Sequence, residues 1–318
     1  MGNAPFNLAI LGPTGSGKTA IAHCLADLVP AIDIVSCDSM QVYRRMNIGS
    51  AKPSPEKLHR YRYHLVDMRE IDETWSLDLF LQAARPLVKA LNQGGRSVLL
   101  VGGTGLYAKA LLYDFKLPKA ESAAYREIFA QTQTPEGRER LQSELIGNSG
   151  GLNLPRDLLQ NPRRLARAVE IVRVQGCLPD GFGSLESDGR QATSQAFRQF
   201  IVMPSAAELR QKIRRRTREM LRQGWLEETA ELLERGLMNT PTARQVLGYR
   251  QVADYLSGRI ASRSELSARI EQKTWQYARR QRTWFRHQHP GAWQLTVLPG
   301  LDSATVARAI MAASSQSV

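Results

Sequence analysis

Short apolar runs alternate with longer amphipathic segments along the first hundred residues. Residues 8–11, 32–37 and 97–101 are the runs that predict buried strands, because a strand covered on both faces reads as a mainly apolar stretch. Residues 19–29 and 76–92 repeat apolar side chains three and four positions apart, as one face of a helix does. Strands that alternate with helices favour an α/β core, in which helices cover both faces of a parallel sheet.

The pattern changes after the first 115 residues. The next segment contains helical patterns separated by clusters of Gly, Asn, Ser and Pro, at residues 123–132, 135–146 and 162–175. We therefore predict a mostly helical insertion domain over 116–198, between a first core part at 1–115 and a second at 199–318.

Residues 199–318 predict completion of the core and a basic helical part. Apolar runs at 64–67 and 200–203 are further strand candidates, and the pattern from 204 to about 289 is helical. The chain has 43 Lys and Arg against 30 Asp and Glu, a net charge of +13, and residues 201–290 alone hold 18 against 9. A localised basic surface is typical of a nucleic-acid binder, although a solvated face would have the same composition.

Composition also bears on location. No apolar run approaches the length of a membrane span, and the first residues do not read as a signal peptide. The three cysteines, Cys24, Cys37 and Cys177, are scattered and form no metal-type pair. We expect a cytoplasmic protein with reduced thiols and no membrane partner.

One loop carries a specific chemical signal. Residues 12–19 read GPTGSGKT and match the phosphate-binding pattern of nucleotide- and ATP-binding proteins, between the strand at 8–11 and the helix at 19–29. Backbone N–H groups at such a helix N-terminus favour anionic oxygens. Lys18 is expected to add a charge, and the Thr19 hydroxyl to bind magnesium. The loop predicts a phosphate, without saying which one.

The ends of the neighbouring strands differ from those of an ordinary ATPase. Such an enzyme usually holds its magnesium with an Asp beside the loop, but the strand at 97–101 runs into Gly102-Gly103-Thr104. Asp38 is the only carboxylate at a plausible strand end, and its candidate roles are magnesium ligand, general base or structural cap. Ligands collect at the carboxyl ends of parallel strands, so Asp38 and Thr104 are expected near the loop.

A basic helix is predicted near the end of the chain. Residues three and four apart give it a polar, mostly basic stripe, namely Arg269, Lys273, Gln276, Arg280, Thr283 and His287. A second face is mainly apolar, namely Leu266, Ile270, Thr274, Tyr277, Gln281 and Trp284. The stripe fits phosphate contacts, and packing is favoured over base stacking for the aromatic residues.

Taken together, these motifs resemble the tRNA dimethylallyltransferases, also called tRNA isopentenyltransferases. The resemblance covers nearly the whole chain and lies in eight blocks of matching order and spacing: GPTGSGKT (12–19), DSMQVY (38–43), IGSAKP (48–53), YHLVD (63–67), LLVGGTGLY (99–107), NPRRLARAVEI (161–171), LGYRQ (247–251) and YARRQRTWFR (277–286).

The resemblance implies a P-loop core pierced by a channel, with dimethylallyl diphosphate entering one side and the anticodon stem-loop of tRNA the other. The target is the adenosine immediately 3′ of the anticodon, flipped out of its stack. Magnesium is the implied cofactor, and a monomeric, bacterial-type enzyme is expected. The loop would bind the diphosphate of the prenyl donor through Gly12, Pro13, Thr14, Gly15, Ser16, Gly17, Lys18 and Thr19.

The resemblance also assigns roles to single residues. Asp38 would be the general base and Thr104 would face the adenosine, while Lys18 and Arg216 would act on the diphosphate. Arg214, Arg215 and Arg218 crowd Arg216, so that alignment leaves the choice among them open. The implied tRNA contacts are Asp38, Ser39, Met40, Gln41, Thr104, Arg126, Arg163, Arg164, Arg167, Arg244, Gly248, Tyr249, Arg280, Gln281, Arg282, Trp284 and Arg286.

The chain departs from the family pattern in three places. Gly15 stands where Ala is common, Trp275 replaces a usual Arg, and residues 147–154 lack the usual Asp-Pro pair. Two other functions remain open: a P-loop kinase of a small hydroxyl substrate with Asp38 as its base, and a non-catalytic RNA-binding protein whose loop senses a nucleotide. Neither explains the loop, the strand ends and the basic helix together.

Overall fold

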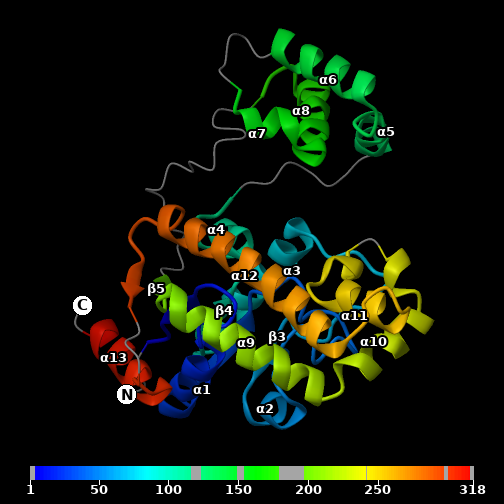
Figure 1. Cartoon of the computed structure of the whole chain (residues 1–318). Coiled ribbons are helices and arrows are strands. Elements are labelled where there is room, and N and C mark those ends of the chain that lie inside the picture. The colour runs from blue at the N-terminus through cyan, green and yellow to red at the C-terminus, as the bar shows by residue number, and fades with distance from the viewer. Residues whose placement is uncertain are drawn as a thin grey trace. The chain divides into compact units, whose positions relative to one another are not determined.

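The computed structural model describes residues 4–115, 123–148, 154–178, 197–240, 242–296 and 300–315. The chain divides into two compact units (Figure 1). The core unit comprises Met1–Leu112 and Ala192–Val318, and the helical unit comprises Tyr113–Gln191. The segment predicted as an insertion, 116–198, covers most of the helical unit, and its first residue lies outside the described residues.

The core unit is built on a six-stranded sheet in the order β3-β2-β4-β1-β5-β6, and every pair of neighbours is parallel. The strands are β1 (Asn7–Leu11), β2 (Ile32–Ser36), β3 (Tyr63–His64), β4 (Ser97–Gly102), β5 (Phe197–Val202) and β6 (Trp293–Leu295). Each residue of β1, β2 and β4 is buried, as their mainly apolar sequences predict. The predicted parallel α/β core is confirmed, and it brings the carboxyl ends of β1, β2 and β4 to one edge.

Two short 3-10 helices, Leu237–Asn239 and Ala243–Gln245, lie in the core unit. α-Helices make up most of the remaining regular structure around the sheet. They are α1 (Lys18–Leu28), α2 (Pro55–Arg60), α3 (Leu77–Gln93), α4 (Gly105–Leu112), α9 (Ala206–Arg222), α10 (Trp225–Glu234), α11 (Tyr249–Leu256), α12 (Arg263–His287) and α13 (Ser303–Ser315). In Figure 1, α13 lies beside α1, and the two helices share an apolar cluster with the strands. The long helix α12 runs along α9, and Trp275 packs there against Leu209 and Ile213. The unusual Trp275 therefore joins two helices.

Local backbone geometry explains where the predicted strands were wrong. The strand expected at 64–67 is instead Tyr63–His64, because Leu65 and Asp67 take positive φ angles of 61° and 54° that no strand allows. The three-residue strand β6 was not predicted, since it lies at the sheet edge and two of its residues are exposed. Gly224, Gly236 and Gly248, also at positive φ, interrupt the helical region after 204.

The described part of the helical unit contains four helices, as expected of a mostly helical segment: α5 (Ala123–Gln131), α6 (Pro135–Gly147), α7 (Arg156–Gln160) and α8 (Pro162–Gln175). Leucines from α6, α7 and α8 meet in its apolar core. Most of the stretch at 147–154 that lacks Asp-Pro lies outside the described residues. Among the described helices, none has the length and apolar character that a membrane crossing requires.

Candidate active site

The phosphate-binding loop joins β1 to α1 and depends on glycine for its shape. Gly12, Gly15 and Gly17 have φ angles of 146°, 80° and 98°, which other residues rarely adopt. A Cβ atom on Gly12 would also lie 2.5 Å from the carbonyl oxygen of Val202. Gly17 precedes α1 without a side-chain cap, so the first N–H groups of the helix stay available to an anion.

Lys18 begins α1 inside this loop, and its Nζ donates a hydrogen bond to the carbonyl oxygen of Pro13 at 2.8 Å. Burial lowers the pKa of Lys18 to about 7; the carboxylate of Asp38 opposes this shift and the guanidinium of Arg216 adds to it. The site therefore holds a lysine that is only partly charged at neutral pH and would gain its proton when an anion arrives.

Arg216 reaches the loop from α9. A capping box of Ser205 and Glu208 starts this helix, and three turns later Nη2 of Arg216 donates to Oγ1 of Thr14 at 2.8 Å. Burial lowers the pKa of Arg216, and Asp38 opposes that shift. Of the neighbouring arginines, Arg214 contacts Glu271 at 3.3 Å, and Arg215 and Arg218 are exposed. Arg216 is therefore the one of these four arginines for which a hydrogen bond to the phosphate-binding loop is seen among the described residues.

Asp38 lies just beyond β2 and is held by its own backbone. Its Oδ1 accepts the N–H groups of Met40 and Gln41 at 2.9 and 3.4 Å. Burial raises the pKa of Asp38, while these N–H groups, Lys18 and Arg216 act in the opposite direction. A carboxylate with a raised pKa is a better proton acceptor, so Asp38 is suited to act as a base.

Thr104 and its preceding glycines hold the end of β4 against the end of β2. Oγ1 of Thr104 accepts the N–H of Ser39 at 3.1 Å, which fixes the segment after Asp38. A Cβ on Gly102 would lie 1.9 Å from the carbonyl oxygen of Cys37, so only glycine allows this approach. The Gly-Gly-Thr sequence thus brings the two strand ends together.

Two cavities meet at these residues. The P-loop cavity, of about 470 Å³, is lined by the loop and by further cations, Lys57 and Lys212 among them, and Asp38 is the only carboxylate among the described residues lining it. The Met220 cavity, of about 250 Å³, combines apolar and aromatic side chains, such as Met220 and Trp225, with polar ones. Both are lined by Thr14, Asp38, Ser50, Arg216 and Tyr277. An anion in the P-loop cavity and a second ligand in the Met220 cavity could therefore approach Asp38 together.

Glu228 of α10 holds residues 47–49, of which Gly49 lines the Met220 cavity. Its carboxylate accepts three consecutive N–H groups, from Asn47, Ile48 and Gly49, at 2.8, 2.8 and 3.0 Å. It also accepts the hydroxyl of Tyr249 at 2.6 Å. A Cβ on Gly49 would lie 2.3 Å from Trp225 and from Tyr249, so the loop, α10 and α11 are closely interlocked.

Tyr249 and Gly248, which the sequence predicts as tRNA contacts, are both buried in the structure. Tyr249 is fully buried and its hydroxyl binds Glu228, so its side chain is not presented to an RNA. Gly248 is buried as well, and a Cβ there would lie 2.1 Å from Trp225. Gln281 is likewise buried, and its amide contacts the phosphate-binding loop. These residues shape the site from within.

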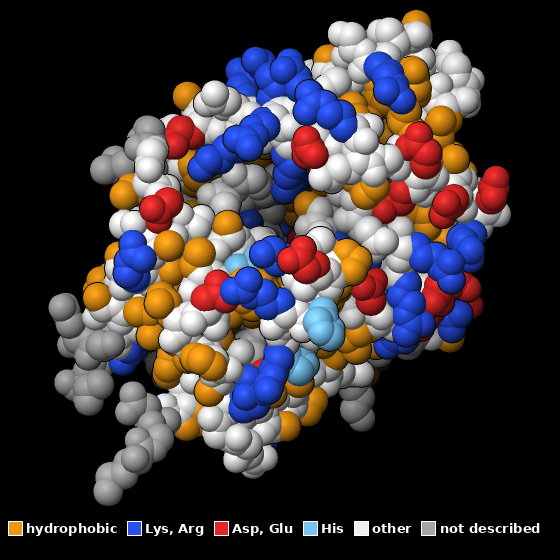
Figure 2. All heavy atoms as spheres, turned by 90° about the horizontal axis from the view of Figure 1, so that it is seen from below, with side chains coloured by type: hydrophobic (Ala, Val, Ile, Leu, Met, Phe, Trp, Pro, Cys, Tyr) orange, Lys and Arg blue, Asp and Glu red, His pale blue; other side chains and the backbone are white. Residues whose placement is uncertain are grey.

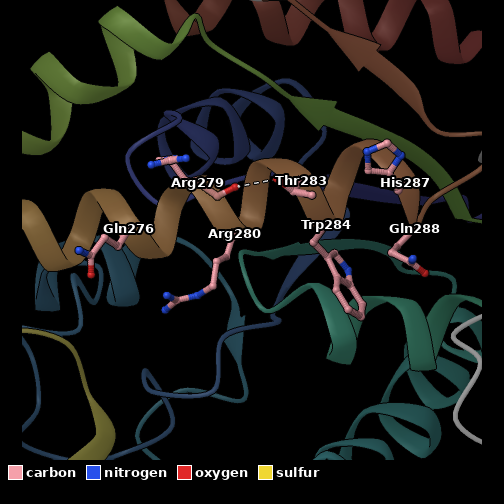
Figure 3. Close-up of a pocket in the computed structure, with 7 residues that line it drawn as sticks. All are labelled: Gln276, Arg279, Arg280, Thr283, Trp284, His287 and Gln288. Carbon is pink, nitrogen blue, oxygen red and sulfur yellow. Dashed lines mark hydrogen bonds between the residues drawn. The ribbon is translucent and has the colours of Figure 1, made fainter. Parts of the chain in front are cut away.

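Other predicted tRNA residues lie where a ligand could reach them. Ser39 and Met40 line the Met220 cavity and Gln41 lines the P-loop cavity. Arg280 and Trp284 line a third cavity of about 560 Å³ on α12, where Trp284 points toward α4 (Figure 3). In the same unit, Arg244 lines a separate groove, Arg282 donates to the carbonyl oxygen of Pro204 at 2.6 Å, and Arg286 is exposed.

The remaining predicted contacts belong to the helical unit. Arg126 on α5 and Arg163 at the start of α8 are exposed, and Arg164 and Arg167 are half-buried. Arg167 forms an ion pair with Glu170 of the same helix. In Figure 2, which shows the molecule from below, Lys and Arg side chains are spread over the visible face among Asp and Glu side chains.

Several residues of the site were not predicted from the sequence. Lys57, Lys212, Ser50, Tyr277 and Glu228 come from five different segments and converge only in the folded chain. Tyr277 had a partial signal, since it lies in the YARRQRTWFR block. Glu228 follows Gly224 and Trp225 in an ordinary amphipathic helix, and no pattern marks it as the acceptor of three backbone N–H groups.

Comparisons with known proteins identify the family of the chain. The model of the IPP transferase family matches residues 41–288. The tRNA dimethylallyltransferase of Geobacillus thermodenitrificans is 35% identical over 90% of this chain and 89% of its own length. The enzyme of the same name from Thermus thermophilus is 36% identical over 89% of both. The crystal structure of the tRNA isopentenylpyrophosphate transferase of Bacillus halodurans matches 96% of both chains, with 28% identity and a TM-score of 0.67. The chain has a P-loop NTPase-like fold and belongs to the tRNA dimethylallyltransferase family.

Proposed function

We propose that the chain transfers a dimethylallyl group from dimethylallyl diphosphate to the exocyclic amine of the adenosine immediately 3′ of the anticodon in tRNA, and releases diphosphate. One observation carries this proposal: a cavity lined by the phosphate-binding loop and cations meets, at Asp38 and Arg216, a second cavity that contains apolar and aromatic side chains. A transfer from a diphosphate ester to a nucleobase needs this arrangement, because the two substrates must meet beside one proton acceptor and approach it from opposite sides.

The P-loop cavity suits the leaving group. As the allylic C–O bond breaks, its electron pair stays on the diphosphate, whose negative charge grows. The N–H groups at the start of α1, the ammonium of Lys18 and the guanidinium of Arg216 lie around one space, where they would stabilise that charge. Lys57 and Lys212 add positive potential at the same cavity.

Magnesium fits this site as a partner of the diphosphate. The hydroxyl of Thr19 and the carboxylate of Asp38 line the P-loop cavity, and oxygen donors of this kind suit magnesium. No group of three His, Cys, Asp or Glu side chains that could hold a metal occurs among the described residues, so diphosphate and water oxygens would complete its coordination. We assign Thr19 as the protein ligand; the bound ion would neutralise part of the leaving-group charge.

Asp38 would take the proton. The adenine amine is a poor base and becomes acidic only as its bond to the allylic carbon forms. A carboxylate with a raised pKa is well matched to accept that proton. The backbone N–H groups of Met40 and Gln41 hold Oδ1 in place, which leaves Oδ2 for the amine.

The Met220 cavity would receive the flipped adenine. Apolar and aromatic surface is offered to a base by Met40, Met220, Trp225 and Leu247. Arg280 lines both this cavity and the third cavity, on α12. Enzymes that modify a base commonly bind it in such a pocket after extrusion. The basic residues of α12 and of the helical unit would contact the anticodon stem-loop.

Incubation with unmodified tRNA and radiolabelled dimethylallyl diphosphate tests the proposal. We expect label to enter the RNA without added ATP. A P-loop kinase would leave the RNA unlabelled and transfer phosphate from ATP, and a non-catalytic RNA-binding protein would bind tRNA without incorporation. Either outcome would contradict the proposed function.

A further inference from the structure

A single buried amide joins the phosphate-binding loop to the basic helix. Gln281, on α12, is only 7% exposed. Its Oε1 accepts the N–H of Thr14 at 2.8 Å, and its Nε2 donates to the carbonyl oxygen of Gly103 at 2.7 Å. Thr14 belongs to the phosphate-binding loop and Gly103 follows β4, so one side chain ties both strand-end segments to α12.

We propose that Gln281 is a positioning residue, which holds the phosphate-binding loop in the shape that binds the diphosphate and does not itself contact tRNA. The proposal rests on the proposed function for the identity of the ligand. It replaces the role in tRNA binding that the sequence suggested for this residue.

The chemistry of the contact requires an amide. The loop presents an N–H donor and the β4 end presents a carbonyl acceptor, so the bridging group must accept and donate at the same time. Among side chains of this length, only glutamine offers both without a charge. Gly103 has no side chain to obstruct this amide, since a Cβ there would lie only 2.8 Å from Nε2 of Gln281. Glycine at 103 therefore leaves room for the bridge.

Thr14 connects the bridge to the cations of the site. Its N–H is held by Gln281, and its Oγ1 accepts the hydrogen bond from Arg216 at 2.8 Å. The neighbouring residue, Pro13, accepts the hydrogen bond from Lys18. Loss of the bridge would release Thr14, which accepts the hydrogen bond from Arg216. Thr14 also follows Pro13, whose carbonyl oxygen accepts the hydrogen bond from Lys18. The predicted consequence is weaker binding of the diphosphate.

The two sides of α12 support a division of roles. Tyr277 and Gln281, one turn apart, line the P-loop cavity. Arg279, Thr283 and His287 line the third cavity (Figure 3). Arg279 and Thr283 each come two positions after Tyr277 and Gln281, and therefore lie on another side of the helix. The same helix thus offers the proposed RNA-binding side chains outward and the loop-holding amide inward.

Paired variants test this assignment. Gln281→Met keeps the length of the side chain and removes both hydrogen bonds, and Gln276→Met makes the same change at an exposed position of α12. Affinity for dimethylallyl diphosphate is measured by calorimetry without RNA, and tRNA affinity is measured separately by filter binding. We expect Gln281→Met to weaken the affinity for dimethylallyl diphosphate, and to raise its KM, by about tenfold. Affinity for tRNA should stay the same, and Gln276→Met should leave donor binding unchanged.

A second variant keeps the proposal testable if Gln281→Met does not fold. Gly103→Ala retains the glutamine but places a methyl group against its amide, and it should reproduce the loss of donor affinity. Two results would overturn the proposal: weaker tRNA binding with normal donor binding, or a lower Tm with both affinities intact. If the wild-type chain binds the donor but labels no RNA, the proposed function fails and the role of Gln281 stands. A wild-type chain without affinity for the donor overturns both.

Discussion

The pKa of Lys18 predicts that binding of the prenyl donor is coupled to uptake of a proton. Burial holds this pKa at about 7 in the free protein, against an ordinary value of 10.5. A diphosphate beside the ammonium group would favour the charged form and raise the pKa again. A group whose pKa rises on binding takes up a proton between the two values, so affinity should increase as the pH falls from 9 to 7.

The size of the effect follows from the fraction of charged lysine. With a pKa of about 7, roughly half of the Lys18 side chains are protonated at pH 7 and about 1% at pH 9. If the charged form is the one that binds, the apparent Kd scales with the inverse of that fraction and rises about fiftyfold over this range. The terminal phosphate of the donor, with a pKa near 6, is already ionised there.

Calorimetric titration of the protein with dimethylallyl diphosphate, without tRNA, measures both the affinity and the number of protons taken up on binding. Titrations at pH 8 in two buffers of different ionisation enthalpy give the number of protons exchanged, which we expect to be about 0.9 per donor bound. In Lys18→Ala the uptake should vanish and the affinity should become weak and independent of pH. Asp38, whose pKa is raised, also faces the cavity, and Asp38→Asn separates its contribution. A wild-type affinity that is constant from pH 7 to 9, with no proton exchange, would refute this account of Lys18.

Three further predictions concern other parts of the site. Asp38→Asn should lower the single-turnover rate with pre-bound tRNA by about a hundred- to ten-thousandfold and spare donor affinity; an unchanged rate would mean that the proton goes elsewhere. Glu228→Gln replaces one accepting oxygen by a donor and should lower the free energy of unfolding by roughly 1–3 kcal/mol. Hydrogen exchange at the amides of Asn47 and Ile48 should become faster, and Tyr249→Phe, which removes a single hydrogen bond, is the milder control. Lys273→Ala should flatten the log–log salt dependence of tRNA affinity by about one unit, and an unaltered slope would show that this lysine is only solvated.

Local patterns were enough to predict the centre of the fold. The apolar run at 8–11, the glycine-rich loop and the following amphipathic segment predict a strand, an anion loop and a helix, and β1 and α1 form there. The rule that parallel strands end at one edge then predicts that Asp38 and Thr104 lie near the loop. The structure places Asp38 in the P-loop cavity and hydrogen-bonds Thr104 to the adjacent Ser39.

Long-range contacts set the limit of that reasoning. A motif marks Tyr249 and Gln281 as residues of interest, but it does not tell whether a side chain faces the ligand or supports the residue that does. Glu228 reaches its three N–H groups across 180 residues of sequence, and nothing local encodes that contact. Likewise, the positive φ of Leu65 ends a strand that its apolar side chain alone would extend.

The most direct test of the proposed function is to locate the transferred group on the RNA. Unmodified tRNA is incubated with the protein and dimethylallyl diphosphate, digested by nucleases and analysed by mass spectrometry. The account predicts one dimethylallyl group on the amine of the adenosine 3′ of the anticodon, and a strongly reduced yield with Asp38→Asn. A modified nucleotide elsewhere in the tRNA, or none at all, would contradict it.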